Sequence, residues 1–205
     1  MSESSRLPGP ALSRPSEVYF HGRLEVITDS ERRSLRSIVT TAYEAALRTD
    51  CILVGLIAIP GLRIFRGVRT ASLNQPLIPH AVVAGRRLLL IESVAWPPGR
   101  YEFLADGRIC CDGIYIGQSA APFLAAVRQW RTTVAQDQKV SGMIIMHGDA
   151  GADISLLAAA DRALAWVRAE NAVLEVRRRL AQGPEMVSTS LLEVLFQAVG
   201  DEPGR

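Results

Sequence analysis

Lysine is nearly absent from this chain. Lys139 is the only lysine among 23 Lys and Arg residues, so arginine supplies the other 22. We attribute this bias, together with the abundance of alanine, to a GC-rich bacterial genome rather than to function. Any mechanism that needs a lysine amine therefore has one candidate in the whole sequence.

Cysteine is also scarce, and its spacing suits neither a disulfide nor a metal site. The three cysteines are Cys51, Cys110 and Cys111. Two adjacent cysteines make a poor disulfide pair, and without a C-x-x-C pair a structural zinc site is not expected. We expect reduced, buried cysteines in a cytoplasmic protein.

Long hydrophobic runs are missing as well. The longest apolar run, residues 51–59, stops at Pro60-Gly61, whereas a membrane helix needs about 20 residues. The first 15 residues are rich in Ser, Pro and Arg and have no apolar core, so they do not predict a signal peptide. We therefore expect a soluble protein with no membrane partner.

The net charge does not point to a nucleic-acid partner, and the composition is that of an ordinary globular protein. The formal net charge of +2 is weaker than the basic excess of a dedicated nucleic-acid binder. Hydrophobic residues make up 48% of the 205 residues and charged residues 21%, which is typical of a globular protein with one core. We expect a flexible N-terminal tail over residues 1–16, a single domain over 17–200, and a short C-terminal tail over 201–205.

Hydrophobic periodicity predicts alternating helices and strands. Strands are predicted over residues 51–59, 62–68, 78–84, 88–94, 101–104, 108–111, 140–147 and 154–158. Helices are predicted over residues 28–49, 118–135 and 190–199, and residues 161–170 and 173–181 are predicted as either one bent helix or two. Two of the strand pairs are predicted hairpins, 78–94 and 101–111. The fold class that follows is α/β, with a mixed central sheet and flanking helices.

The most informative stretch is residues 80–99, which begins at His80 and contains Glu92 near the end of a strand and the turn Trp96-Pro97-Pro98-Gly99. Further along come Gln118, the helix that follows it, and the apolar strand that ends Met146-His147-Gly148. This order resembles the nuclease-related (NERD) branch of the PD-(D/E)xK restriction-endonuclease-like superfamily. The resemblance covers residues 39–160 approximately.

The resemblance implies a chemistry that this chain has largely lost. In the family, two carboxylates hold a Mg²⁺ ion that activates water, and a lysine offsets charge in the transition state. Pro79 stands where the metal-binding aspartate is expected, and Val94 stands where the lysine is expected. Of the three groups only Glu92 remains. The resemblance therefore implies a degenerate nuclease with no cofactor, and Mg²⁺ is expected only if the enzyme is active.

Three residues occupy the remnant motif positions: Glu92, His80 and Gln118. Glu92 is either a former metal ligand or a strand-end carboxylate paired with an arginine, and we favour the second. His80 is interpreted as a hydrogen-bonded strand residue, and Gln118 as part of a helix start. Trp96 has the flat ring that stacks on bases, but packing over the hairpin is the favoured interpretation.

Several arginines are candidates for binding phosphates. One interpretation places five of them along one edge of the sheet near the motif, where they would contact a nucleic-acid backbone. These are Arg63, Arg66, Arg69, Arg86 and Arg87.

Three hypotheses follow. The first is a non-cleaving module that binds a protein partner or nucleic acid. The second is an active metal-dependent nuclease with relocated groups, which requires a carboxylate such as Asp149 or Glu44 beside Glu92. The third is a structural subunit that forms a homo-oligomer through the last helix. Its apolar residues, which equally suit the domain's own core, are Leu191, Leu192, Leu195, Phe196 and Val199.

Overall fold

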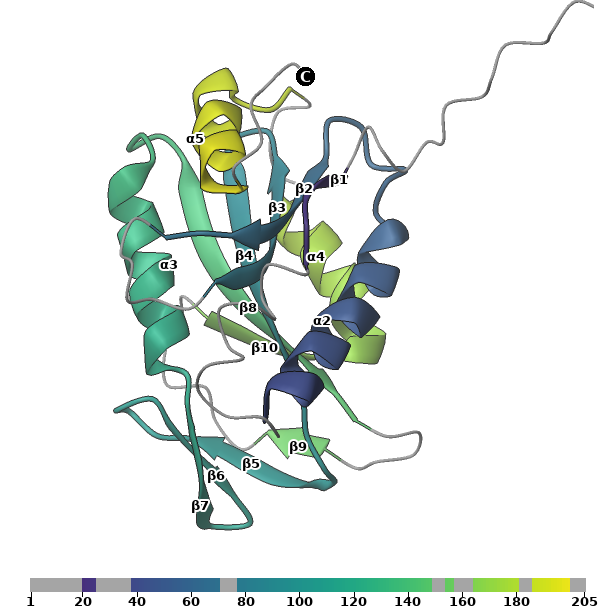
Figure 1. Cartoon of the computed structure of the whole chain (residues 1–205), viewed down its shortest axis with the longest axis vertical. Coiled ribbons are helices and arrows are strands. Elements are labelled where there is room, and N and C mark those ends of the chain that lie inside the picture. Colours follow the sequence, from purple (N-terminus) through teal and green to yellow (C-terminus); the bar gives the residue numbers. More distant parts are fainter. Residues whose placement is uncertain are drawn as a thin grey trace, which may run out of the picture.

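A computed structural model describes residues 20–24, 38–70, 77–148, 154–156, 164–180 and 186–199 (Figure 1). The strands are β1 (Phe20–Gly22), β2 (Arg63–Val68), β3 (Ile78–Ala84), β4 (Arg87–Ala95), β5 (Gly99–Phe103), β6 (Arg108–Cys111), β7 (Ile114–Ser119), β8 (Lys139–His147), β9 (Ile154–Leu156) and β10 (Leu164–Arg168). The helices are α2 (Ile38–Val54), α3 (Ala121–Thr133), α4 (Ala172–Leu180) and α5 (Thr189–Val199), with a short 3-10 turn, Ala169–Asn171, before α4.

Six strands form a mixed central sheet in the order β1-β2-β3-β4-β8-β10. β2, β3 and β4 are antiparallel neighbours, whereas β8 runs parallel to β4 and β10 runs parallel to β8. Helix α3 supplies the crossover between β4 and β8 that a parallel pair requires. The expected α/β class with a mixed, helix-flanked sheet is confirmed.

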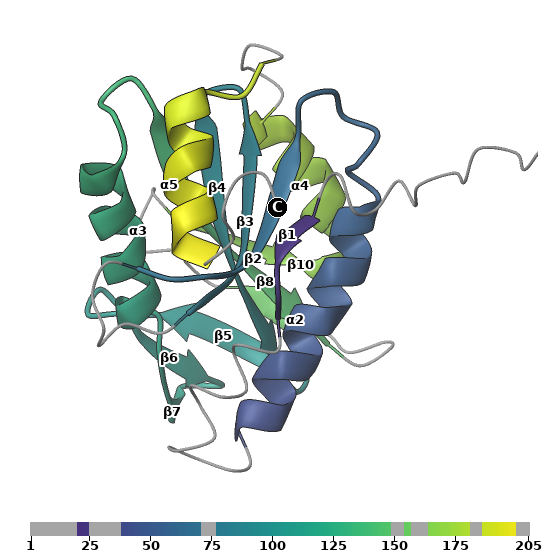
Figure 2. The ribbon, with the colours of Figure 1, turned by 45° about the horizontal axis from the view of Figure 1, so that its top comes forward.

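Helices cover both faces of this sheet, because the central strands alternate between two apolar layers. Leu88 and Leu90 of β4 pack with α3 and α5 on one face. Leu89 and Ile91 pack with α2 and α4 on the other. Figure 2 shows α3 and α5 on one side of the sheet and α2 with α4 on the other.

A smaller four-stranded sheet, in the order β7-β6-β5-β9, lies at the carboxyl end of β4 (Figure 1). β5 follows β4 after three residues, and Trp96 N donates to His147 O at 3.0 Å, which ties the turn to the end of β8. An aromatic cluster that includes Tyr101 and Phe103 packs between the two sheets. The second sheet therefore covers the end of β4 where Glu92 lies.

Most predicted strands are present. β3 and β4 form the predicted hairpin, with Ala84 paired to Arg87 across the turn, and β5 with β6 forms the second. The strands predicted over 62–68 and 140–147 are β2 and β8, and β9 covers the described part of the strand predicted over 154–158. The predicted tails, 1–16 and 201–205, and the start of the helix predicted over 28–49 lie outside the described residues.

The strand predicted over 51–59 is wrong. Helix α2 continues through residues 51–54, and turns follow to residue 61. Leu53 and Leu56 are buried, while Cys51 and Val54 are exposed, so the apolar residues continue one helical face rather than filling a strand buried on both sides. The run extends a helix already begun, and packing on the sheet overrides the β propensity of its residues. The expectation that Cys51 is buried is wrong for the same reason, and all three cysteines are free.

The helix predicted over 161–170 is also wrong, because residues 164–168 form β10. This segment pairs in parallel with β8 from Leu164 opposite Gly142 to Arg168 opposite Met146. Its alanines favour a helix, but the free edge of β8 offers backbone hydrogen bonds that only an extended segment can take. The structure also adds β7, for which no strand was predicted, and α3 begins at Ala121 rather than at Gln118.

The last helix belongs to the domain's own core. Leu191 and Leu195 of α5 are fully buried against the sheet, and Leu192, Phe196 and Val199 pack against the same cluster. Phe196 meets the Phe65 ring edge-on, with centroids 5.3 Å apart. No helix in the described part of the chain is long and apolar enough to cross a membrane.

Candidate functional site

A pocket of about 300 Å³ opens at the carboxyl end of β4, between the central sheet, the start of α3 and the second sheet. Glu92, Trp96 and Gln118 all line it, so the structure brings together three of the residues singled out from the sequence. Val94, which stands at the expected lysine position, lines the same pocket. We call this the Glu92 pocket.

Strand alternation explains why Glu92 faces this pocket. Leu88 and Leu90 face α3, so Glu92 and Val94 follow on the same face of β4. Glu92 is half-buried, and its Oε1 accepts a hydrogen bond of 2.9 Å from the backbone N–H of Ser93. Whether Glu92 also pairs with an arginine, as predicted, stays a prediction.

Trp96 and Gln118 line the same pocket and are hydrogen-bonded to each other. The indole Nε1 of Trp96 donates to Gln118 Oε1 at 2.9 Å. Since an indole N–H only donates, this contact sets the orientation of the Gln118 amide. Trp96 is 4% exposed and stacks on Tyr101 with ring centroids 4.3 Å apart. The structure therefore agrees with packing as the role of Trp96, and it corrects the interpretation of Gln118, which belongs to β7 rather than to a helix start.

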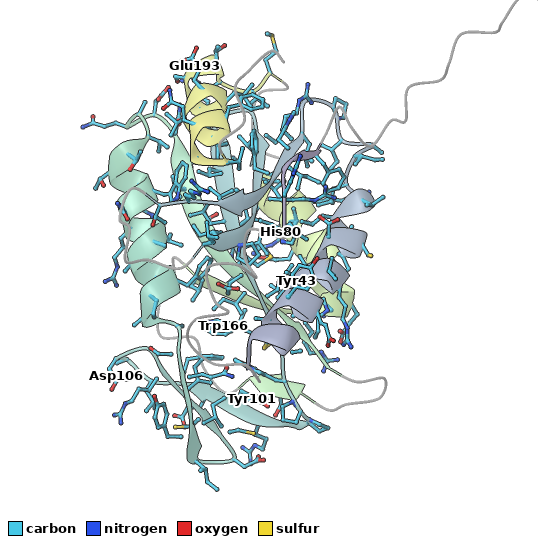
Figure 3. All side chains as sticks on the ribbon, viewed as in Figure 1. Tyr43, His80, Tyr101, Asp106, Trp166 and Glu193 are labelled. Atoms are coloured by element: carbon cyan, nitrogen blue, oxygen red, sulfur yellow. The ribbon has the colours of Figure 1, made fainter. Side chains whose placement is uncertain are left out.

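His80 (labelled in Figure 3) pairs with Ile91 across the sheet and contacts Asp50 of α2, so it lies on the α2 face. Glu92, the next residue after Ile91, points to the other face. The His80 side chain is fully buried, and its Nε2 donates to Asp50 Oδ1 at 3.2 Å. Asp50 also accepts two hydrogen bonds from Arg66, Nε to Oδ1 at 2.7 Å and Nη2 to Oδ2 at 2.6 Å. The interpretation of His80 as a hydrogen-bonded strand residue is confirmed, and its partners are a carboxylate and a neighbouring guanidinium.

These charges set the protonation of the His80 group. Burial alone would raise the pKa of Asp50, but hydrogen bonds from His80 and Arg66 bring that pKa below its usual value. Burial lowers the pKa of His80, although Asp50 acts in the opposite direction. At neutral pH the group therefore consists of a charged Asp50–Arg66 pair and a neutral imidazole.

A second polar group lies beside the first and was not predicted. Thr49 Oγ1 is 2.8 Å from Ser93 Oγ and 2.7 Å from His147 Nε2, and all three side chains are buried. The sequence held a signal only for the first group: Arg66 breaks the apolar alternation of β2, and a buried strand tolerates such a break only when a partner such as Asp50 is near. Nothing in the spacing of Thr49, Ser93 and His147 indicates that they meet, because they come from α2, β4 and β8.

The arginines do not line one edge of the sheet near Glu92. Arg87 is the first residue of β4 and Glu92 the sixth, which separates their Cα atoms by about 17 Å at the usual strand rise. Arg63 lies toward that same far end, opposite Val83. Arg86 pairs with Asp137, and Arg66 pairs with Asp50 on the α2 face. Arg69 follows β2, where its backbone N–H donates to Ala198 O.

Lys139 does not reach the Glu92 pocket. Its side chain is exposed. In the register of β4 and β8, Lys139 lies opposite Arg87, whereas Glu92 lies opposite Ile144, five residues further along β8. Glu44 is exposed on α2 and does not line the pocket, and Asp149 lies outside the described residues. Within the described ranges, no group of three or more His, Cys, Asp or Glu side chains is placed to hold a metal ion.

Acid is expected to destabilise the fold between pH 6.5 and 4. Burial, followed by the positive charge of Arg48 and by that of His80 once it is protonated, lowers the pKa of His147 from 6.5 to about 4. Between pH 6.5 and 4 the unfolded chain therefore binds a proton at His147 that the folded chain does not bind. The free energy of unfolding is thus highest above pH 6.5 and decreases as the pH falls toward 4. His80 acts in the same direction. We expect a loss on the order of 2 kcal/mol, measured by urea unfolding at pH 7.0 and 4.5.

The matched variant is His147→Gln, which keeps a polar side chain but cannot titrate. Its unfolding free energy should change less over this pH range than that of the wild type. Asp50 does not confound the comparison, because its lowered pKa places its titration below 3.8. An unchanged pH dependence in the variant would show that His147 is not the group responsible.

The structure thus places Glu92, Trp96 and Gln118 in one pocket and His80 in a buried ion-pair group on the other face, and none of the five candidate arginines is among the described residues that line the pocket. No family model matches the chain, and neither does any curated protein or solved structure.

Proposed function

We propose that this chain is a nuclease-related domain that binds a partner without cleaving nucleic acid. The observation that carries the proposal is the content of the Glu92 pocket. Glu92 and Val94 face it together from β4, so an aliphatic side chain occupies the position at which the NERD resemblance implies a lysine. The single lysine of the chain lies at the start of β8 instead.

The arrangement of elements supports the same proposal. The order that the resemblance implies is a hairpin, a turn, a helix and an apolar strand, and the chain has these in β3 with β4, the turn at residues 96–98, helix α3 and the parallel strand β8. A chain that keeps this order and lacks the lysine retains the surfaces of the fold without the group that offsets charge in phosphoryl transfer.

The chemistry of the pocket favours a protein partner over nucleic acid. The described lining of the pocket contains a carboxylate, and a carboxylate repels phosphate. Two of the candidate arginines, Arg66 and Arg86, already pair with aspartates. The other three candidate arginines, Arg63, Arg69 and Arg87, are not among the described residues that line the pocket.

The test is a cleavage assay on the full chain with supercoiled plasmid and single-stranded DNA and RNA, in Mg²⁺ and in Mn²⁺. We expect no cleavage above that of the Glu92→Ala variant. Metal-dependent cleavage by the wild type that disappears in Glu92→Ala would overturn the proposal and favour an active nuclease with relocated groups. A labelled DNA duplex in the same buffers, followed by fluorescence anisotropy, separates nucleic-acid binding from protein binding.

A further inference from the structure

β10 is the edge strand at one end of the central sheet. It pairs in parallel with β8, and within the described part of the chain no second strand pairs with it. An edge strand presents a row of backbone N–H and C=O groups to whatever lies outside the sheet. Many edges are protected by a proline, a bulge or several charges, but β10 has no proline, keeps an unbroken register with β8, and carries its only charge at its last residue, Arg168. β10 is therefore able to accept a further strand.

A groove of about 560 Å³, which we call the β10 groove, lies along this strand. All five residues of β10 line it, among them Trp166, which Figure 3 labels. Because successive side chains of a strand point to opposite faces of the sheet, a hollow that touches five consecutive residues lies at the edge rather than on one face. The other described lining residues come from α4 and the turn before it, and include Leu174, Glu175 and Arg178. The groove lies beside about 16 Å of strand, which is the length of an extended five-residue peptide.

The α4 residues of the β10 groove carry a surplus of positive charge. Glu175 accepts hydrogen bonds from both Arg178 and Arg179, so one carboxylate offsets only one of two guanidinium charges. Arg178 is 67% exposed and donates two of its five N–H groups to Glu175, which leaves donors for a ligand. Leu174, one helical turn before Arg178, is 71% exposed. The groove therefore suits a ligand that has a carboxylate next to an apolar side chain.

Charge and backbone pairing decide which occupant fits the β10 groove. Two copies of this chain paired through their β10 edges would bring the same α4 arginines toward each other around a twofold axis, and like charges oppose that contact. Arg168, which also lines the groove, has Glu170 as its ion-pair partner, so this pair is close to neutral. A nucleic acid would contact the arginines but has no peptide groups to pair with the strand. An acidic, extended peptide uses both the strand edge and the arginines.

We propose that the β10 groove binds an extended acidic segment of a partner protein, which pairs with β10 as a further strand of the central sheet. Main-chain hydrogen bonds to β10 hold the segment, and one of its carboxylates accepts hydrogen bonds from Arg178. An apolar side chain of the segment packs on Leu174. The inference goes beyond the proposed function, because it concerns a second surface that shares only Trp166 with the described lining of the Glu92 pocket.

The test is fluorescence anisotropy of labelled, capped peptides with the full chain. The acidic probe is Gly-Val-Glu-Val-Glu-Val-Gly, and the lysine probe is Gly-Val-Lys-Val-Lys-Val-Gly. We expect the acidic probe to bind about tenfold or more tightly than the lysine probe. Two further versions of the acidic probe carry N-methyl groups on one or the other alternate set of amides. Because the amides of a strand point alternately to its two sides, one set should abolish binding and the other should not.

Arg178→Glu reverses a charge on α4, so the acidic probe should bind about tenfold or more weakly, and the lysine probe should bind more tightly than it does to the wild type. Arg177→Glu is the matched control, because Arg177 is exposed on the same helix and is not among the described residues that line the groove. Equal weakening by the two variants, or equal effects of the two N-methylated sets, would overturn the inference.

The other occupants give different results in the same samples. A single-stranded DNA oligonucleotide that displaces the acidic probe at an equal concentration would assign the β10 groove to nucleic acid and overturn the inference. A dimer in sedimentation velocity that Arg178→Glu alters and Arg177→Glu does not would assign the groove to a second copy, with the same consequence. Absent binding of the acidic probe refutes this inference alone, whereas Glu92-dependent cleavage refutes the proposed function alone.

Discussion

Replacement of Asp50 by alanine is expected to lower the unfolding free energy by about 3 kcal/mol at pH 7. Asp50 accepts both hydrogen bonds of the Arg66 fork and one from the fully buried His80. Without the carboxylate, the imidazole N–H is buried with no acceptor and the guanidinium loses its counter-charge. For a chain of this length the melting temperature should fall by roughly 6–12 °C.

The matched control is Asp137→Ala, which breaks the ion pair between Asp137 and Arg86. Those side chains are 52% and 59% exposed, and an exposed pair contributes about 1 kcal/mol or less. Urea unfolding followed by circular dichroism measures both variants. If Asp50→Ala costs no more than Asp137→Ala, the buried group does not hold α2 on the sheet in the way the distances indicate.

Replacement of Gly142 by valine is also expected to lower the unfolding free energy by about 3 kcal/mol. Gly142 lies in β8 where α3 crosses the sheet, and a Cβ atom there would be 2.8 Å from Val127 Cγ2 and 2.9 Å from Leu164 Cδ1. Both are side chains of the buried core, so they cannot move without disturbing their neighbours. Gly142→Ala should also lower the unfolding free energy, by a smaller amount, because alanine adds only the Cβ atom.

A double-variant cycle tests the cause. Val127→Ala removes the atom nearest to the new Cβ, so Gly142→Ala combined with Val127→Ala should cost about 1 kcal/mol less than the sum of the two single changes. Additive costs would mean that crowding against α3 is not the reason for the loss. Chemical denaturation of the four proteins in one buffer supplies the comparison.

The candidate site was predictable only in part, and the reason is geometric. Glu92, Trp96 and Gln118 belong to an order of elements that a linear sequence displays, and they share the Glu92 pocket. Asp50 was not predicted as a partner of His80, because it lies at a position where a helix was expected to have ended. Once α2 continues to Val54, its buried face carries Thr49 and Asp50 onto the sheet.

What the sequence by itself determined is local. The alternation of β3 and β4, the short turn between them and the helical spacing of α3 and α5 follow from side-chain periods, which depend on neighbours in the chain. Composition likewise showed that Lys139 is the only lysine that could take part in any mechanism.

Only the tertiary structure decided where the ambiguous segments go. Residues 51–54 extend a helix because Leu53 packs on the sheet, and residues 164–168 form a strand because β8 offers an edge to pair with. Both segments are apolar runs whose local preferences are weak, so energies of burial and backbone pairing with distant residues select the conformation. Those same distant contacts separate His80 from Glu92, since adjacent strands can present their side chains to opposite faces of one sheet.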